Sequence, residues 1–391
     1  MINFDFCSPT KIFFGKNRED EISTILKSYS AKRVLLVYGS GSIIKSGLYD
    51  KIISNMESDN IEYFELSGVR PNPSVISVRA GVQIVKEKQI DFILAVGGGS
   101  VIDVAKAIAV SYQYAGDPYD FNLYKVQPAI ALPIGVILTL SASGSELSSS
   151  CVISNDELGV KQGFNNNLVR PVFTILNPEL TYSVGKFQTG CGIVDIISHS
   201  LERYFSKSGN FEFSDRVALA IIKNTIECGS ICINEPNNYD ARAAMMLNGS
   251  FSHNGIASVG KKSIMPIHAI EHAISAFKID VAHGAGLSVL IPAWMNYTYK
   301  VDIDKFVIFT ETVFNLHFVN KDESAKIGIQ SLKTYFKSIG MPTTLTELGI
   351  QKTDIPAIVD KMTNGGTRLI GTGSIYPLSK EDLISLLNDA I

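Results

Sequence analysis

The sequence predicts an α/β domain built on a parallel sheet, followed by an all-helical domain. Strand, glycine-rich turn and helix alternate along residues 1–185, which is typical of a parallel sheet with helical crossovers. Long helical periodicities with almost no strand pattern fill residues 186–391. A chain of 391 residues with 46% hydrophobic residues is long and apolar enough for two buried cores.

Composition narrows the classes of partner and compartment. The 35 basic and 38 acidic residues give a net charge of −3, and no basic tract stands out, so neither nucleic acid nor an anionic membrane is expected as a partner. The five cysteines are scattered and odd in number, which favours reduced thiols and a cytoplasmic location. The N-terminus has no signal-peptide pattern. Residues 126–145 are uncharged, but prolines and a glycine–serine run favour buried strands over a membrane span.

The first domain is predicted from short apolar runs that alternate with helical spacing. The candidate strands are 33–38, 61–66, 90–96, 129–138, 150–153 and 172–176. Helices are expected from about residue 43, over 74–88 and from about residue 101. In the second of these, the apolar stripe is Val75, Val78, Val82 and Val85.

The second domain is predicted from helical periodicity alone. The candidate helices are 189–206, 212–232, 239–258, 266–277, 284–299, 303–316 and 321–338, followed by a last stretch over 354–390. Near the end of the chain Ser379 is a favourable N-cap, and Asp382 occupies the capping-box position.

Three turns rich in glycine and serine follow predicted strands. Residues 97–100, GGGS, come directly after a buried strand and open a helix, where bare backbone and unpaired N–H groups suit a pyrophosphate. Alone this run also fits a plain tight turn. Gly39-Ser40-Gly41-Ser42 and the segment 141–145 end two other strands, and in an open α/β sheet ligands bind beyond the carboxyl ends of strands. Together the three turns predict a dinucleotide site.

The end of the first predicted strand bears on the choice of cofactor. A site selective for NAD often has a carboxylate there, which binds the ribose 2′-hydroxyl and would repel a 2′-phosphate. This chain has Gly39 and then serines, with Lys45 a few residues on. We therefore expect NADP(H) to be favoured over NAD(H).

Five polar residues of the second domain have the spacing of a metal site. Asp195 and His199 are spaced i, i+4, as are His268 and His272, and His283 follows eleven residues later. A single such pair is usually a packing coincidence, but two pairs and a fifth candidate favour a divalent metal. One carboxylate with several imidazoles suits Fe²⁺ or Zn²⁺, which would act as a Lewis acid on an alcohol or aldehyde oxygen while a nicotinamide carries the hydride.

The remaining histidines have no partner in the sequence. His253 and His317 are therefore interpreted as core or surface residues.

Beyond these patterns, the chain resembles the iron-containing (group III) alcohol dehydrogenases, especially the NADPH-dependent aldehyde reductase and butanol dehydrogenase branch. The resemblance covers nearly the whole chain. It rests on RPNP at 70–73, AVGGGSVIDVAK at 95–106, SGSE at 143–146, LNPELTYSV at 176–184, GIVDIISHSLERYF at 192–205, HAIEH at 268–272 and HGAGLSVLIPAWM at 283–295.

The resemblance implies a fold and a set of site residues. The fold is a Rossmann-like domain and a helical metal domain, an architecture similar to that of dehydroquinate synthase, usually in dimers or larger oligomers. By motif position the metal ligands are Asp195, His199, His268 and His283, and His272 is a candidate for substrate positioning or proton relay. Asp195, His268 and His272 are thus the catalytic candidates. The implied cofactor residues are Gly39, Ser40, Ser42, Gly97, Gly98, Gly99, Ser100, Asp103, Thr139, Leu140, Ser143, Lys161 and Tyr182.

This chain departs from the family pattern at three places. It has one residue more than relatives usually show between His272 and His283. The segment before His268, VGKKSIMPI, lacks a glycine-rich run with tryptophan, and Ser143 stands where the family has threonine. None of these changes removes a predicted ligand.

The expected activity is hydride transfer between NADP(H) and small primary alcohols or aldehydes, with aldehyde reduction favoured. A glycerol dehydrogenase, another polyol oxidoreductase or a maleylacetate reductase are alternatives within the oxidoreductases. A lyase of the dehydroquinate synthase type needs several basic residues near the metal, and the helices that carry the histidines are poor in them. A non-catalytic protein would not need an intact set of ligands.

Overall fold

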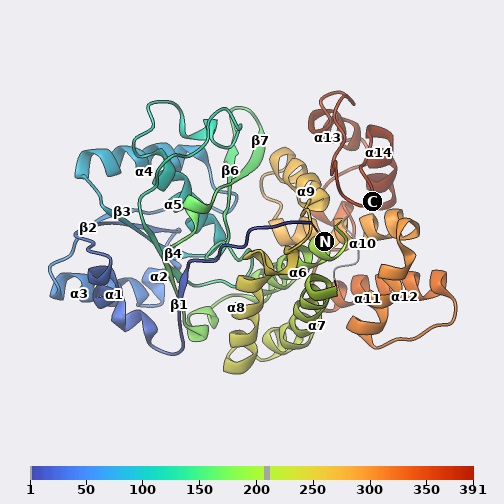
Figure 1. Ribbon diagram of the computed structural model, residues 1–391, viewed down its shortest axis with the longest axis horizontal. Coiled ribbons are helices and arrows are strands. Elements are labelled where there is room, and N and C mark those ends of the chain that lie inside the picture. The colour runs from blue at the N-terminus through green and yellow to red at the C-terminus, as the bar shows by residue number, and fades with distance from the viewer. Residues whose placement is uncertain (1, 207–211) are drawn as a thin grey trace. The chain divides into compact units, whose positions relative to one another are not determined.

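The computed structural model describes residues 2–206 and 212–391, and it divides into two compact units (Figure 1). One unit is Cys7–Val184, and the other is Gly185–Ile391 together with the N-terminal segment as far as Phe6. In that segment the N–H of Ile2 donates to the carbonyl of Gly260 at 3.4 Å. The first residues therefore pack with the helical unit.

A six-stranded sheet with every strand pair parallel forms the centre of the first unit, as the sequence predicts for the fold class. The strand order is β1-β8-β5-β4-β2-β3. The bounds are β1 Lys11–Phe14, β2 Arg33–Tyr38, β3 Glu62–Leu66, β4 Phe92–Gly97, β5 Ile134–Leu138 and β8 Phe173–Leu176. The predicted strand 129–138 is thus shortened to β5, and the four-residue edge strand β1 was not predicted because its side chains are largely accessible.

Residues 150–153 form a strand, but not in the parallel sheet. They belong to β6 (Ser150–Asn155), which pairs antiparallel with β7 (Val160–Asn165) in a separate two-stranded sheet. The two strands are joined by four residues ending in Gly159, whose φ is +58°. A connection this short permits only a hairpin, since a parallel pair needs a long crossover.

The helices of this unit include the three predicted ones, with one break, and α1, which was not predicted. They are α1 Ile22–Ser28, α2 Ser42–Lys45, α3 Leu48–Ser58, α4 Val75–Lys88 and α5 Gly99–Ser111. The helix expected from residue 43 is divided into α2 and α3 at Gly47, whose φ of +76° is left-handed and ends a right-handed helix. All four valines of the stripe predicted for α4 are buried, and Ser74 caps that helix.

The second unit consists of helices, as predicted. They are α6 Lys186–Tyr204, α7 Glu212–Asn234, α8 Tyr239–His253, α9 Pro266–Phe277, α10 His283–Thr298, α11 Ile303–Phe314, α12 Lys321–Ser338, α13 Ile355–Met362 and α14 Lys380–Asp389. The helix expected over 239–258 ends at residue 253, and the last stretch is two helices rather than one. The capping box of Ser379 and Asp382 is confirmed.

Within the described residues, α7 alone is long and apolar enough to cross a membrane by length and composition. Half of its most apolar window is buried inside the protein, and the core helix of a soluble protein passes the same test. This helix therefore gives only weak evidence for a membrane span. The uncharged segment 126–145 contains the buried strand β5.

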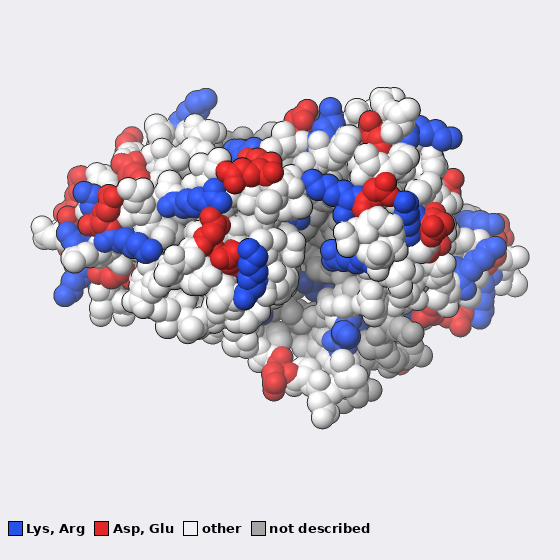
Figure 2. Space-filling model, turned by 90° about the horizontal axis from the view of Figure 1, so that it is seen from above, with Lys and Arg blue, Asp and Glu red and all other residues white. Residues whose placement is uncertain are grey.

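Charged side chains on the face drawn in Figure 2 are interspersed, with blue and red side by side and no broad area of one sign. This is the distribution expected from 35 basic and 38 acidic residues. Nothing on that face has the appearance of a basic surface for nucleic acid.

Close packing at the middle of the sheet gives a test of the fold. A Cβ atom added at Gly135 in β5 would lie 2.6 Å from Cε1 of Phe173 in the neighbouring strand β8. We expect Gly135→Ala to lower the free energy of unfolding by about 1–3 kcal/mol, because the ring is held in a packed core. Urea unfolding followed by circular dichroism measures this loss.

The control is Phe173→Leu, alone and together with Gly135→Ala. Since the smaller side chain removes the atoms that the new methyl group meets, the double variant should lose at least about 0.5 kcal/mol less than the sum of the single variants. Strictly additive losses would show that this contact is not the cause.

Candidate metal and cofactor sites

Four of the predicted metal residues come together in the helical unit. Asp195 and His199 lie one turn apart on α6, His268 lies on α9, and His283 is the first residue of α10. Oδ1 of Asp195 lies 3.4 Å from Nδ1 of His199, 3.5 Å from Nε2 of His268 and 3.8 Å from Nε2 of His283. One carboxylate oxygen thus faces three imidazole nitrogens.

The buried polar atoms of this cluster lack hydrogen-bond partners among the described residues. These atoms are Oδ1 of Asp195, Nδ1 of His199 and Nε2 of His268. Buried polar groups are almost always hydrogen-bonded, and a site for a bound ion is one of the few explanations for an exception. An oxygen and several imidazole nitrogens that converge without hydrogen bonds are the donors that Fe²⁺ or Zn²⁺ prefers, so the residues fit a metal.

Two fully buried carboxylates hold the outer nitrogens of this cluster. Glu202 on α6 contacts Nδ1 of His268 and also accepts the backbone N–H of Ile267 at 2.6 Å. Glu271 on α9 contacts Nδ1 of His283. A carboxylate behind a ligating histidine fixes the ring and directs the opposite nitrogen inward.

A second group of possible donors, Glu271, His272 and His283, lies beside the first. Within it, Glu271 accepts from the hydroxyl of Ser275 with one oxygen and contacts His283 with the other. The Glu271 carboxylate therefore holds the His283 ring in place. The His272 ring lies 5.5 Å from that of His283 and 6.4 Å from that of His268, which puts this partly accessible imidazole at the margin of the cluster.

The protonation of two histidines differs in a way that matters for metal binding. Burial, and then repulsion from the other imidazoles and Arg203, holds the pKa of His199 well below its usual range, so this ring is neutral. Burial also opposes a charge on His268, but Glu202 and Asp195 outweigh it and raise the pKa of His268 to about 9. A cation bound there would have to displace that proton.

The start of α10 approaches α6 more closely than a side chain would allow. A Cβ atom at Gly284 would lie 2.5 Å from the Cα of Cys191. The residue after His283 is therefore glycine for steric reasons, and the contact holds His283 opposite Asp195. The extra residue predicted before His283 does not keep its Nε2 from lying 3.8 Å from Asp195.

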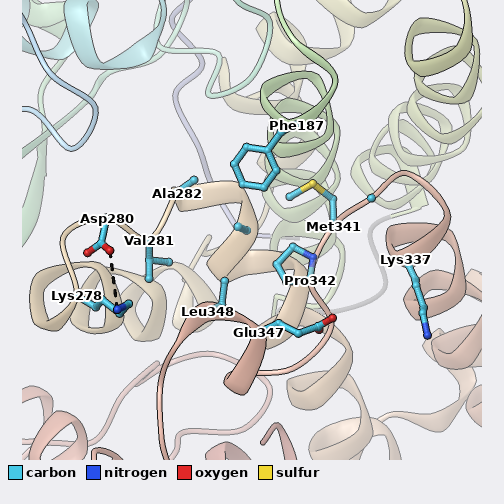
Figure 3. A pocket seen from close by; sticks show the side chains of 12 residues that line it. Phe187, Lys278, Asp280, Val281, Ala282, Lys337, Met341, Pro342, Glu347 and Leu348 are labelled. Atoms are coloured by element: carbon cyan, nitrogen blue, oxygen red, sulfur yellow. Dashed lines mark ion pairs between the residues drawn. The ribbon is translucent and has the colours of Figure 1, made fainter.

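Four of the five residues that lead into α10 line a pocket of about 490 Å³ (Figure 3), namely Lys278, Asp280, Val281 and Ala282. Ala282, Ala285 and Met341 are among the residues that line it. Lys278 and Asp280 form an ion pair at 3.8 Å across its edge. The segment in which the sequence predicts an extra residue is thus partly accessible and bordered by groups of both charges.

One histidine of the cluster was not predicted. His253 was interpreted as a core or surface residue, but its ring centroid lies 4.0 Å from that of His199. No sequence spacing indicates this contact, because the two residues are far apart and lie on different helices. His317 is exposed and pairs with Glu311 at 3.5 Å, as a surface residue would.

The predicted cofactor turns gather at one edge of the sheet. In the strand order, β5, β4 and β2 are neighbours, so Thr139 and Leu140, the GGGS turn and the turn after Tyr38 follow adjacent carboxyl ends. A Cβ atom at Gly98 would lie 3.3 Å from Leu140, and one at Gly99 would lie 3.2 Å from Cβ of Ser143. The 97–100 and 139–145 turns therefore touch, at the N-terminus of the 13-residue helix α5.

The other predicted cofactor residues are more dispersed. Asp103, in the first turns of α5, accepts the hydroxyl of Ser145 at 2.6 Å and the N–H of Val152 at 3.0 Å. Burial raises the pKa of Asp103, while Lys106 and Lys161 oppose that rise. Lys161 lies on β7, in the hairpin, and Tyr182 follows the short helix η4 (Pro178–Thr181) after β8. Asp103 thus joins the hairpin to the turn after β5.

Comparison with known proteins covers both units. Residues 9–178 match the family model for iron-containing alcohol dehydrogenases, and residues 189–391 match the model for the C-terminal part of the Fe-containing alcohol dehydrogenase family. The chain belongs to the iron-containing alcohol dehydrogenase family. It is 40% identical to NADH-dependent butanol dehydrogenase A of Clostridium acetobutylicum, over 99% of each chain.

More distant members have related activities in their names. The chain is 32% identical to NADPH-dependent aldehyde reductase YqhD of Escherichia coli, over 95% of each chain. The crystal structure of an NADH-dependent butanol dehydrogenase A from Thermotoga maritima has a TM-score of 0.95 at 36% identity, and the match covers 99% of this chain and 98% of that one. This chain is therefore an NAD(P)-dependent oxidoreductase of the iron-containing alcohol dehydrogenase family. The predicted family, fold class and enzyme class are confirmed.

The outer carboxylate Glu202 provides a test of the candidate metal centre. We expect Glu202→Gln to weaken the binding of Zn²⁺ by about 10- to 100-fold, because an amide holds the His268 ring less well than a carboxylate does. Competition with a chromophoric chelator measures the affinity.

Glu311→Gln is the matched control, since Glu311 pairs with the exposed His317. It should leave the affinity within about twofold of the unaltered protein. Equal affinity in both variants would mean that Glu202 does not support a ligand.

Proposed function

We propose that this alcohol dehydrogenase reduces small aldehydes to primary alcohols with NADPH and catalyses the reverse reaction with NADP⁺. The observation that carries the proposal is the buried Asp195 oxygen facing three imidazole nitrogens at 3.4–3.8 Å. Butanol dehydrogenases and an aldehyde reductase among the relatives support the class of substrate. The relatives favour a dehydrogenase over a lyase.

The residues of the helical unit have three proposed roles: metal ligation, support of the ligands, and substrate positioning or proton transfer. Asp195, His199, His268 and His283 are the proposed ligands of Fe²⁺ or Zn²⁺, a Lewis acid that polarises an alcohol or aldehyde oxygen when bound. Glu202 and Glu271 hold two of the rings so that their Nε2 atoms point toward Asp195. His272, outside the ligand set, is proposed to position the substrate or to give and take the proton of its hydroxyl group.

NADP(H) is proposed because the turn after β2 has no carboxylate. Gly39, Ser40 and Ser42 offer backbone and hydroxyl groups, which suit a phosphate oxygen and repel none. The GGGS turn and the start of α5 are proposed to bind the pyrophosphate. The unit Cys7–Val184 would thus be the dinucleotide-binding domain, and the helical unit the catalytic domain. By family resemblance we also propose a cytoplasmic enzyme that forms a dimer or a larger oligomer.

The two histidines of the HAIEH motif should respond differently to substitution. We expect His268→Ala to weaken Zn²⁺ binding by at least about 100-fold and to abolish NADPH oxidation with butanal. His272→Ala should retain the metal within about twofold and lower kcat by about 10²- to 10⁴-fold, because only a proton-transfer or positioning group is lost. Metal analysis and initial rates, with butanal and glyceraldehyde compared, check both variants.

Chelation of the unaltered enzyme is the companion experiment. Activity that survives complete metal removal, or that survives His268→Ala, would defeat the proposed mechanism. Equal metal loss in both variants would instead make His272 a ligand.

A carboxylate introduced after β2 tests the choice of cofactor. A Cβ atom at Gly39 would make only an ordinary contact, 3.5 Å from the carbonyl of Val69, so Gly39→Asp should be tolerated. We expect the ratio of kcat/KM for NADPH to that for NADH to fall by about tenfold or more, because the new charge repels the 2′-phosphate. A strong preference for NADH in the unaltered enzyme would refute this part of the proposal.

A further inference from the structure

The cluster contains an imidazole that neither the proposed ligand set nor the proposed proton transfer uses. The His253 ring lies with its centroid 4.0 Å from that of His199 and its plane tilted by 35°. The ring centroid of His268 lies 4.5 Å from that of His199, and the two ring planes are tilted by 27°. At these distances and tilts the rings contact each other through their faces, so His199 is packed against imidazoles from α8 and from α9.

The local backbone holds His253 at a defined place. It is the last residue of α8, and the chain turns immediately afterwards at Gly255, whose φ of +108° is unfavourable for other residues. The buried Asn254 fixes this turn by accepting the N–H of Ile256 at 2.9 Å. The ring is therefore carried by a capped helix end.

The register of two helices brings His253 to His199. Nη1 of Arg242, in the first turn of α8, donates to the hydroxyl of Thr189, near the start of α6, at 3.2 Å. His253 lies eleven residues beyond Arg242, and His199 lies ten residues beyond Thr189, so the two helices advance by nearly the same distance of about 15–17 Å. The contact between the rings thus follows from parallel packing of α8 along α6.

We propose that His253 is a positioning residue of the metal centre, which holds the His199 ring in the orientation needed for ligation and thereby increases the affinity for a divalent metal. The inference rests on the proposed function, because it takes His199 to be a ligand. Nδ1 of His199 is the nitrogen that faces Oδ1 of Asp195, at 3.4 Å. Glu202 and Glu271 hold the outer nitrogens of the His268 and His283 rings. The His199 ring has the flat ring of His253 against its face, and this ring supplies the restraint.

The experiment compares three variants of the full chain. His253→Ala removes the ring, His253→Phe keeps a flat ring of similar size without nitrogen, and His317→Ala removes an exposed histidine elsewhere. Each protein is titrated with Zn²⁺ against a chromophoric chelator, and the visible absorption of bound Co²⁺ is recorded. Circular dichroism of the metal-free proteins shows whether they are folded, and His253→Leu replaces the alanine variant if that one is not.

We expect His253→Ala to weaken Zn²⁺ binding by about tenfold or more and to change the Co²⁺ spectrum. His253→Phe should restore both within about threefold and His317→Ala should change neither, because a flat ring is what His199 requires. Unchanged affinity and spectrum in His253→Ala would overturn the inference while leaving the proposed function intact. A phenylalanine variant as weak as the alanine variant would overturn it too, since His253 would then act through a nitrogen. An unaltered enzyme that binds neither Zn²⁺ nor Fe²⁺ would overturn both.

Discussion

A buried carboxylate that faces several imidazoles is the constraint on which the helical unit depends. Asp195 is 4% exposed, and its Oδ1 has no hydrogen-bond partner among the described residues. An uncompensated charge at such a place would strongly destabilise the fold. Three helices nevertheless converge on it, and Gly284 lets α10 lie against the backbone of α6. The packing of these helices thus creates a buried polar site whose atoms have no hydrogen-bond partners among the described residues.

The balance of charge around this site also favours a bound divalent cation. Three buried carboxylates, Asp195, Glu202 and Glu271, lie close together, and one buried guanidinium, Arg203, donates to the carbonyl of His199 at 2.6 Å. With neutral imidazoles, two negative charges remain, which one divalent cation balances. The rise in the pKa of His268 to about 9 is the response of an imidazole to that excess of negative charge. Electrostatics and the set of donor atoms therefore agree on the kind of ion that fits.

Local periodicity predicted the fold class and the residues that gather, because it reports which side chains share a helix face. The pair Asp195 and His199 is such a case, and so is the capping box of α14. What periodicity missed depends on contacts between elements. Glu202 lies in the same motif as His199, yet it serves a ring on another helix, and His253 reaches His199 only because α8 packs parallel to α6. The hairpin β6–β7 was missed for a similar reason, because the sequence of a short strand does not indicate which strand pairs with it.

The preference for NADP(H) or NAD(H) depends on a few local residues. Relatives named as NADH-dependent are 37–40% identical to this chain, and the NADPH-dependent aldehyde reductase is 32% identical. Identity over the whole chain averages hundreds of positions, most of which pack the sheet and the helices. In the proposed site the few groups at the end of β2 would distinguish the 2′-phosphate of NADP(H) from a hydroxyl, since a single carboxylate there would contribute a repulsion of about 1–4 kcal/mol. The Gly39–Ser42 turn carries no such charge, so the proposal of NADP(H) rests on the chemistry of this turn and not on identity over the whole chain.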